Sequence, residues 1–422
     1  MESYWSVGTE APDTPPLPST LRVDAAVVGA GFSGIAAAYY LAEAGLSVAL
    51  LEAGEAADGA SGRNGGQVLP GWSENMVRVA DRHGVEVAGA LWSLAEEALR
   101  RVSDLAAMHN IDCDLARVGH LEAGGSAREI AELEAELRFL ERWRDRNRSW
   151  WDAAQIEAAV GTRAYLGGYF DPGGMAFHPR RYALGLLGQA RRMGVQLYQH
   201  TPVRGWERRH GGFRVGAGQG FVECREIVLA TNAYPPAFAP WLRSRILPVS
   251  SAQVAIRLSE RDVLPPAMPT VSDTKAELNY YRRVGQDTFL FGGRALASEF
   301  RRGDFASLRR QLADLFPSLA RAPVTHQWSG RIAITRDFIP HLMRMPDGVW
   351  TLGGYTGHGA ALSTEFGFLA AHAVTHERPD PRAEALMAMD WHAFPLGRAG
   401  RHLFPVVVGA LDVRRRLALK RR

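Results

Sequence analysis

A strand–turn–helix–strand pattern between residues 22 and 52 constrains the fold more than any other part of the chain. Gly29-Ala30-Gly31-Phe32-Ser33-Gly34 follows a short apolar run and precedes Ile35 to Glu43, an Ala- and Leu-rich stretch that favours a helix. A second apolar run, residues 47–51, ends at Glu52. This arrangement predicts the βαβ unit of a Rossmann-type parallel sheet, the setting in which a glycine-rich turn binds a dinucleotide.

Each glycine of this turn has a physical role. Gly29 permits the tight turn, Gly31 lets the backbone approach a pyrophosphate, and Gly34 allows the helix to pack closely on the strand. The first amides of the helix favour phosphate because they are unpaired and lie at the positive end of the helix dipole. Glu52 is placed to accept hydrogen bonds from ribose hydroxyls. A glycine-rich turn without a ligand is the alternative.

A second glycine-rich string, Gly59-Ala60-Ser61-Gly62-Arg63-Asn64-Gly65-Gly66-Gln67, has more glycine than a packed loop needs. Closely spaced glycines let backbone amides converge on an anionic or carbonyl-bearing ligand. Arg63 is a candidate for the pyrophosphate, and Asn64 or Gln67 for the ring atoms of a flavin. An ordinary loop remains the alternative.

A third string, Gly353-Gly354-Tyr355-Thr356-Gly357-His358-Gly359-Ala360-Ala361, leads into an apolar helix. It predicts a second positive helix end, which would stabilise the negative charge that a flavin gains on reduction. His358 is a candidate to add a hydrogen bond there, and it is equally compatible with an exposed loop histidine.

Composition limits the function classes. The formal net charge of +4 comes from the tail: residues 401–422 contain seven basic residues and one acidic residue, which leaves the rest of the chain at −2. No general phosphate-attracting field follows, so we expect no nucleic-acid partner. The sequence has no transmembrane run and no secretory signal, and its two cysteines indicate neither disulfides nor a metal site. We therefore expect a cytoplasmic protein without a metal.

With these motifs in place, the chain resembles the D-amino-acid-oxidase-type family of FAD-dependent amine oxidoreductases over nearly its whole length. Within that family it is more similar to the γ-glutamylputrescine oxidoreductases than to the glycine and sarcosine oxidases. The resemblance rests on residues 27–34, 51–53 and especially 59–67, with further matches at 229–234, 291–294, 328–331 and 354–359.

The resemblance implies an α/β fold with a Rossmann-like FAD-binding domain, built on a parallel sheet with a βαβ unit, and a substrate domain with a large, mostly antiparallel sheet. We assign residues 20–85, 150–240 and 325–400 to a discontinuous FAD-binding domain and residues 86–149 and 241–324 to the substrate or cap domain. We expect residues 401–422 to form a basic C-terminal helix or tail.

The resemblance also implies the cofactor, FAD, and the residues that bind it. Some relatives hold FAD covalently through a histidine near the second string or a cysteine near Ala333; this sequence has neither, so we expect non-covalent FAD. The expected cofactor-binding residues are Gly29, Gly31, Phe32, Ser33, Gly34, Glu52, Ala53, Ser61, Arg63, Asn64, Gly65, Gly66, Gln67, Val203, Ala230, Thr231, Gly330, Gly354, Tyr355, Thr356, Gly357, His358 and Gly359.

The implied reaction passes a hydride from the carbon that carries an amine to flavin N5, and the resulting imine hydrolyses. The expected substrate is a small amine, such as an acylated polyamine like γ-glutamylputrescine, or an amino acid, with O2 as the acceptor. The expected catalytic or substrate-contacting residues are Tyr281, Tyr355, His358 and Arg294, and further candidates for the pocket wall or a substrate carboxylate are Trp72, Tyr280, Trp328 and Arg282.

Two other classes stay open. One is a flavin dehydrogenase that passes electrons to a membrane acceptor, with a peripheral membrane contact through the basic C-terminus; a docked helix with solvated arginines is the alternative for that tail. The other is an RNA-modifying flavoenzyme, against which the charge of −2 outside the tail argues.

Overall fold

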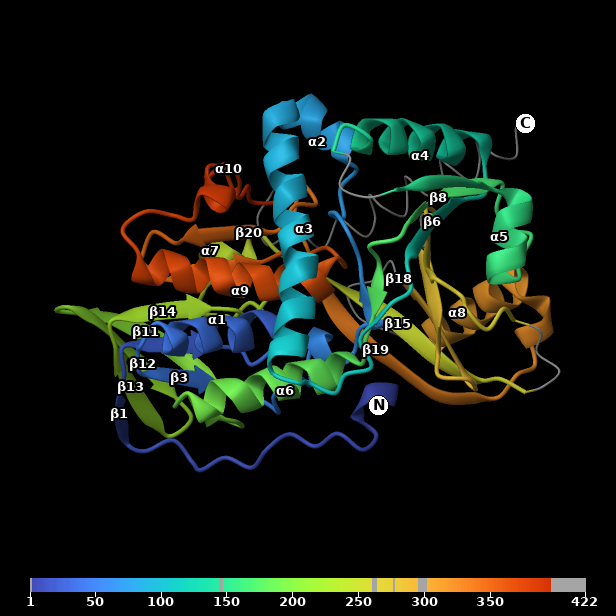
Figure 1. Cartoon of the computed structure of the whole chain (residues 1–422). Coiled ribbons are helices and arrows are strands. Elements are labelled where there is room, and N and C mark those ends of the chain that lie inside the picture. The colour runs from blue at the N-terminus through green and yellow to red at the C-terminus, as the bar shows by residue number, and fades with distance from the viewer. Residues whose placement is uncertain (1, 144–146, 260–263, 276–277, 295–301, 396–422) are drawn as a thin grey trace.

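A computed structural model gives the fold of the chain and describes residues 2–143, 147–259, 264–275, 278–294 and 302–395. The basic tail at 401–422, and with it the membrane contact expected from that tail, lies outside the described residues. No helix among the described residues combines the length and the apolar character needed to cross a membrane. Two large sheets organise the molecule, one on each side of the view in Figure 1.

The first sheet has six strands in the order β10-β3-β2-β14-β21-β20, of which β20 alone runs antiparallel to its neighbour. Every residue of β2 and β3 is buried, which explains why the sequence there is a continuous apolar run rather than an alternating one. The strands are β2 (Ala25–Val28), β3 (Val48–Leu51), β10 (Gln196–Tyr198), β14 (Glu226–Leu229), β20 (His341–Arg344) and β21 (Trp350–Gly353).

Helices and a small sheet cover this six-stranded sheet. The helix α1 packs against both α6 and α9, and α3 crosses α9 (Figure 1). The covering helices are α1 (Phe32–Glu43), α3 (Val85–Met108), α6 (Pro179–Arg192) and α9 (Gly359–Thr375). A four-stranded sheet, ordered β1-β13-β12-β11, lies beside the six-stranded sheet. Residues of both sheets form a second cluster of buried apolar side chains. Its strands are β1 (Thr20–Arg22), β11 (Val203–Arg209), β12 (Gly212–Ala217) and β13 (Gly220–Cys224).

The second large sheet has eight strands in the order β19-β15-β18-β17-β16-β6-β8-β7, and all pairs except β16 with β6 are antiparallel. Its strands are β6 (His120–Gly124), β7 (Ser149–Asp152), β8 (Gly167–Asp171), β15 (Leu247–Arg257), β16 (Thr270–Asp273), β17 (Asn279–Val284), β18 (Thr288–Arg294) and β19 (Val324–Ile334). The expected fold class, a Rossmann-like parallel sheet with a large, mostly antiparallel sheet, is confirmed. The strands β7, β8 and β19 extend this sheet into ranges that we assigned to the cofactor domain.

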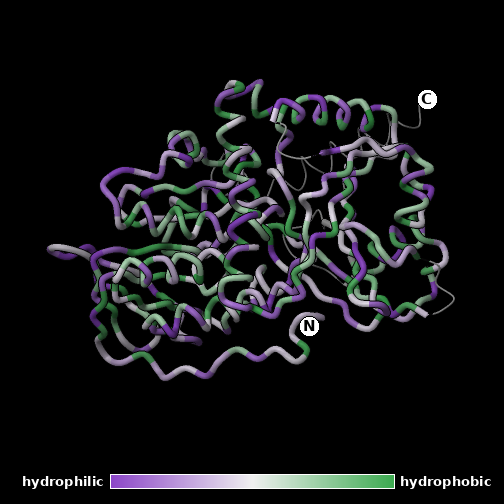
Figure 2. The backbone as a smooth tube through the Cα atoms, viewed as in Figure 1, coloured by the Kyte–Doolittle hydropathy of each residue, from purple (hydrophilic) through white to green (hydrophobic). Residues whose placement is uncertain are grey.

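The remaining elements close the ends of the two sheets. They are β4 (Gln67–Val68), β5 (Ala116–Arg117) and β9 (Met175–Ala176), which pair in a three-stranded sheet, and the helices α2 (Met76–His83), α4 (Ala127–Leu140), α5 (Ala153–Val160), α7 (Pro240–Arg243), α8 (Arg302–Leu315) and α10 (Glu384–Met387). Figure 2 shows hydrophobic and hydrophilic residues alternating around α4, so one of its faces is polar. Its other face is buried through Leu133, Leu137 and Leu140.

Candidate functional site

A cavity of about 910 Å³ joins the carboxyl ends of β2, β3 and β14 to one face of the eight-stranded sheet. Its wall contains parts of all three glycine-rich strings, with Glu52, Val203, Ala230, Thr231 and Gly330. Ligand sites of about 300–1,000 Å³ are usual in proteins, and in open parallel sheets they lie beyond the carboxyl ends of the strands. The structure thus places most of the expected cofactor residues on one continuous surface.

The first glycine string forms a tight turn against β14. Gly29 has φ +101°, and a Cβ there would lie 2.9 Å from the carbonyl oxygen of Ala230. A Cβ at Gly34 would lie 1.8 Å from the Gly29 carbonyl oxygen, so the start of α1 contacts the turn directly. The Phe32 amide donates to the Ser61 hydroxyl at 2.9 Å, which connects the first string to the second. This close packing leaves the N-terminus of α1 facing the cavity.

Glu52 follows β3 and is held by backbone amides. Its Oε2 accepts from the Ala30 amide at 2.7 Å, and its Oε1 accepts from the Gly54 amide at 2.9 Å. Because a carboxylate oxygen has two acceptor sites, both oxygens keep capacity for hydroxyl donors in the cavity. Glu52 lies beside the glycine-rich turn, at the end of the second strand, where the acid that binds the ribose of a dinucleotide is found in Rossmann-type folds.

The second glycine string is braced mainly by its own side chains. Arg63 donates to the Asp58 carbonyl oxygen at 2.6 Å and to the Asp58 carboxylate at 2.9 Å while lining the cavity. Asn64 accepts from the Gly66 amide at 2.8 Å, and Gln67 donates to the Tyr281 carbonyl oxygen at 3.1 Å. The Asn64 and Gln67 side chains therefore hold the loop in shape, and both residues line the cavity, where their contact with the ring atoms of a flavin stays a prediction.

Distant residues anchor the same loop, and the sequence analysis did not identify them in this role. Trp5 donates from Nε1 to the Asn64 carbonyl oxygen at 2.7 Å, and Trp328 donates to the Arg63 carbonyl oxygen at 3.0 Å. Arg282 donates to the Gly65 carbonyl oxygen at 2.8 Å and to the Phe177 carbonyl oxygen at 2.7 Å. Burial lowers the pKa of Arg282 to about 10. Arg282 is thus committed to backbone carbonyls, and neither it nor the fully buried Trp328 lines the cavity.

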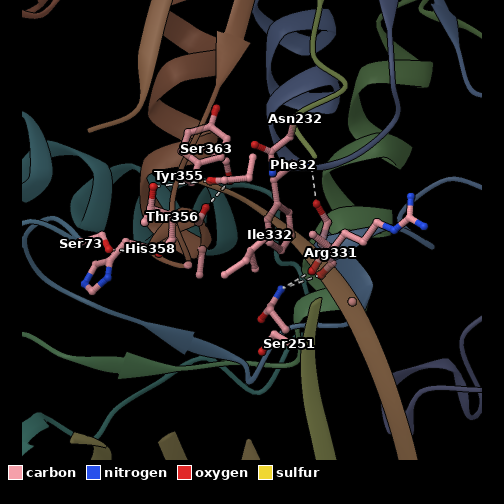
Figure 3. Close-up of a pocket in the computed structure, with 18 of the residues that line it drawn as sticks. Phe32, Ser73, Asn232, Ser251, Arg331, Ile332, Tyr355, Thr356, His358 and Ser363 are labelled. Carbon is pink, nitrogen blue, oxygen red and sulfur yellow. Dashed lines mark hydrogen bonds between the residues drawn. The ribbon is translucent and has the colours of Figure 1, made fainter. Parts of the chain in front are cut away.

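The third glycine string wraps the N-terminus of α9. Thr356 and Gly357 have φ of +51° and +97°, and His358 caps the helix, which begins at Gly359. Tyr355 is buried, and its hydroxyl lies 2.7 Å from the Ser33 hydroxyl, so the two positive helix ends meet here. Burial raises the pKa of Tyr355. Figure 3 shows Tyr355, Thr356 and His358 on one side of this region and Arg331 on the other.

Two unpaired buried atoms test whether a polar cofactor fits this surface. Among the described residues, the hydroxyl of Thr231 and the Oε1 of Gln253 have no hydrogen-bond partner, and both side chains line the cavity. A buried unpaired polar group costs about 1–3 kcal/mol, and native proteins rarely leave one without a partner in the functional state. The residues present therefore fit a flavin dinucleotide, which carries both donors and acceptors.

On the substrate side, the structure separates two neighbouring tyrosines. Tyr281 is 1% exposed and packs among Phe289, Phe291 and Phe316, away from the cavity. Tyr280 points to the opposite face of β17, as alternate residues of a strand do, and lines the cavity. We therefore move the expected wall role from Tyr281 to Tyr280. Arg294 ends β18, and its side chain lies outside the described residues; Trp72 lines the cavity.

The sequence analysis missed a polar cluster at the end of the cavity formed by β6, β8 and α4. Burial raises the pKa of Glu122, and burial together with the Glu122 charge raises the pKa of Glu136 to about 8. His120, two residues before Glu122 on β6, is also buried, and burial with the nearby His358 lowers its pKa to about 3. One signal was present: Glu136 occupies a position on the Leu133, Leu137 and Leu140 face of α4.

Comparisons with known proteins agree with this geometry. The family model described as FAD-dependent oxidoreductase matches residues 24–373. The chain is 30% identical over 368 residues to the probable oxidoreductase OrdL of Haemophilus influenzae, covering 85% of this chain and 84% of that one. It is 28% identical over 399 residues to γ-glutamylputrescine oxidoreductase of Escherichia coli, covering 93% of each.

The solved structures show the same fold. Glycine oxidase from Geobacillus kaustophilus superposes with a TM-score of 0.73 at 22% identity, over 88% of this chain and 100% of that one. The matched family model, the cavity at the strand ends and the two helix N-termini that face it lead to one conclusion. The chain belongs to the family of FAD-dependent oxidoreductases, and its cofactor is FAD.

Proposed function

We propose that this protein oxidises the C–N bond of a small amine or amino acid. One observation carries the proposal: a single cavity connects the three glycine-rich strings to the polar face of the eight-stranded sheet. The relatives named γ-glutamylputrescine oxidoreductase and glycine oxidase support a nitrogen-bearing substrate. The three glycine-rich strings and Glu52 would hold FAD, which would supply the acceptor for a hydride from the carbon that bears the amine. Water would then hydrolyse the imine product.

The chain's own residues bind the cofactor, orient the substrate and exclude water from the cavity. The N-termini of α1 and α9 face the cavity with partial positive charge, which favours phosphate at one and developing negative charge at the other. Tyr280 and Trp72 form an aromatic wall on the substrate side of the cavity. This wall restricts how the carbon chain of a substrate lies against the cofactor. No covalent bond from a protein residue is required.

Within this class, we place the substrate among linear amines, with acylated polyamines such as γ-glutamylputrescine first and amino acids second. O2 is the proposed acceptor. Support comes from the identity of 28% to the γ-glutamylputrescine enzyme, compared with 25% to glycine oxidase of Geobacillus kaustophilus.

The test is an anaerobic panel of alkylamines, acylated diamines, glycine, sarcosine and D-alanine, scored by bleaching of the flavin absorbance. Bleaching reports the first half of the reaction whatever the acceptor is. Bleaching by acylated diamines, followed by peroxide formation on admitting air, is the expected result. Bleaching by glycine, sarcosine or D-alanine alone contradicts the polyamine assignment, and bleaching without peroxide contradicts O2 as the acceptor.

A further inference from the structure

Two carboxylates on the cavity wall have neutral hydrogen-bond partners and no ion pair among the described residues. Glu122 accepts from the Tyr169 hydroxyl at 2.9 Å. Glu136 accepts from the Asn75 side-chain amide at 2.8 Å and from the Met76 amide at 3.0 Å. Glu122 and Glu136 are here called the carboxylate pair.

Most other acids that line the same cavity have an ion-pair partner among the described residues. Glu74 is paired with Arg82, Glu132 with Arg78 at 3.2 Å, and Asp171 with Arg148 at 2.8 Å. Glu52 also lacks an ion pair in the described part of the chain, but it lies beside the first glycine string and accepts from two backbone amides. The carboxylate pair differs from it because it places two carboxylates without an ion pair together. Two adjacent carboxylates in a protected site are costly when both are ionised, and burial with their mutual repulsion raises the pKa of Glu136 to about 8. A cation bound between them would remove that cost.

Trp92 gives an independent indication that a ligand belongs at this end. Its side chain is 4% exposed and lines the cavity, yet its indole Nε1 has no hydrogen-bond partner among the described residues. It stacks on Trp143, which follows α4, and lies under Arg148, the partner of Asp171 on β8. An unpaired buried N–H is unusual in native proteins, and an acceptor oxygen of a ligand, such as the carbonyl of an acylated diamine, would satisfy it, whereas an ammonium group would not.

The chemistry of the site favours an organic cation over a metal ion. The described residues contain no group of three or more His, Cys, Asp or Glu side chains positioned to hold a metal. An ammonium group has three donors and no acceptor, so it matches two carboxylates that already receive neutral donors on their other sides. The approach is along an aromatic and apolar wall that includes Trp72, Leu133 and Tyr280, which suits an alkyl chain.

The position of the pair fits a chain that reaches it from the cofactor side. His120 lies near His358 of the third glycine string, and Glu122 is two residues further along β6. Two residues of a strand extend about 7 Å, a distance that a short alkyl chain spans. One end of a linear substrate can therefore lie at the cofactor loops while the other reaches the carboxylate pair.

We propose that Glu122 and Glu136 bind a second, non-reacting ammonium group of the substrate, so that this enzyme selects diamines and their derivatives over monoamines. The inference rests on the proposed function, because it assigns the far end of the substrate whose near end is oxidised. Putrescine carries such an ammonium on its free end. γ-Glutamylputrescine carries one on its glutamyl end, beside a carboxylate and several bonds further from the oxidised carbon.

The experiment measures anaerobic flavin reduction by putrescine, cadaverine, butylamine, pentylamine and the amino alcohol of putrescine's length. Titration gives the substrate Kd and the limiting reduction rate separately. The wild-type protein should bind each diamine about tenfold to a hundredfold more tightly than the monoamine of equal length, as expected for charge-assisted hydrogen bonds in a protected site. The amino alcohol, which carries no positive charge at that end, should bind more weakly than the diamine.

The variants Glu122→Gln and Glu136→Gln should each remove most of that preference by raising the diamine Kd, while the monoamine Kd changes less than about twofold. Glu134→Gln is the matched control, because Glu134 lies on the same helix, exposed and paired with Arg138 at 3.5 Å. The flavin spectrum verifies that each variant holds its cofactor. If a variant loses flavin, the wild-type comparison of diamine, amino alcohol and monoamine decides the question without it.

Two failures are distinguishable. If no amine in the panel or in the acylated series bleaches the flavin, the proposed function itself is wrong. If amines bleach the flavin but diamines and monoamines bind equally, or the two Gln variants keep the diamine preference, the carboxylate pair is not an ammonium site and the proposed function stands.

Discussion

The Tyr280 hydroxyl lies 2.9 Å from the Ser251 hydroxyl, across a strand that separates the two residues. The contact is available because the intervening residue of β18 is Gly292, where a Cβ would lie 2.2 Å from the Tyr280 ring. On the other side, a Cβ at Gly65 of the second glycine string would lie 2.9 Å from the same ring. Tyr280 is therefore held flat between the sheet and the cofactor loop.

The two neighbouring tyrosines should respond oppositely to truncation. Tyr281→Ala should lower the free energy of unfolding by about 3–5 kcal/mol, because it leaves a cavity among buried aromatic rings. Tyr280→Ala should cost less stability and lower the rate or affinity of anaerobic amine reduction. Urea unfolding and flavin bleaching measure the two effects. Equal loss of activity in both variants, after correction for cofactor content, would show that Tyr280 has no special place at the substrate.

FAD binding should tolerate loss of the Glu52 side chain better than the addition of a side chain at Gly31. Gly31→Val should abolish FAD binding, because a Cβ there already lies 2.9 Å from the Ser61 hydroxyl, which receives the Phe32 amide. Glu52→Ala should weaken binding by about 1–3 kcal/mol through lost charged hydrogen bonds. Cofactor content after gel filtration gives both results. Gly205→Ala is the control, since a Cβ there meets nothing within 4 Å. Full occupancy in Gly31→Val would overturn the assignment.

The N-terminal segment should be needed for cofactor retention. Trp5→Ala should accelerate FAD loss, because Trp5 is fully buried and donates to the Asn64 carbonyl oxygen of the second glycine string. Trp5→Phe should have an intermediate effect, as it keeps packing but lacks the donor. Val7→Ala is the neighbouring control, since Val7 is 56% exposed. Fluorescence of released flavin during dilution follows the rate; equal rates in all three variants would exclude this anchoring role.

FAD should be released intact by acid. The expectation follows from the lack of an attachment cysteine near Ala333 and of an attachment histidine near the second glycine string. Acid precipitation should leave a yellow supernatant with a colourless pellet, and mass spectrometry of the pellet should show the unmodified chain. Flavin that stays with the precipitated protein would mean a covalent link, with His120 and His358 the first residues to map, since both line the cavity.

Stability should fall as pH rises through the range set by Glu136. Burial raises its pKa from 4.5 to about 8, so between those values the folded protein holds a proton that the unfolded chain releases. The free energy of unfolding therefore decreases from pH 5 to pH 8 by this contribution. Glu136→Gln should flatten that dependence, and Glu134→Gln should leave it unchanged. Urea unfolding at both pH values tests this; identical slopes in wild type and Glu136→Gln would contradict the raised pKa.

The cofactor half of this protein could be predicted from its amino-acid sequence, because the signals there are local. All of these signals lie within one βαβ unit. They are Gly29, which adopts φ +101°, two apolar runs that form fully buried parallel strands, and the acid Glu52 at the end of the second run. The large, mostly antiparallel sheet came instead from the family resemblance, and β15, β16, β17 and β18 form part of it.

Which side chains of the eight-stranded sheet line the cavity became clear only in the folded protein. Tyr280 and Tyr281 are equivalent in local sequence, and the face that meets the cofactor loop depends on how the sheet docks. Likewise, Glu136 looks like one more charge on a solvated helix until α4 packs over β6 and β8. Trp5 and Asn64 are 59 residues apart. Such contacts depend on chain reversal between distant elements, which local patterns of hydrophobicity and glycine do not encode.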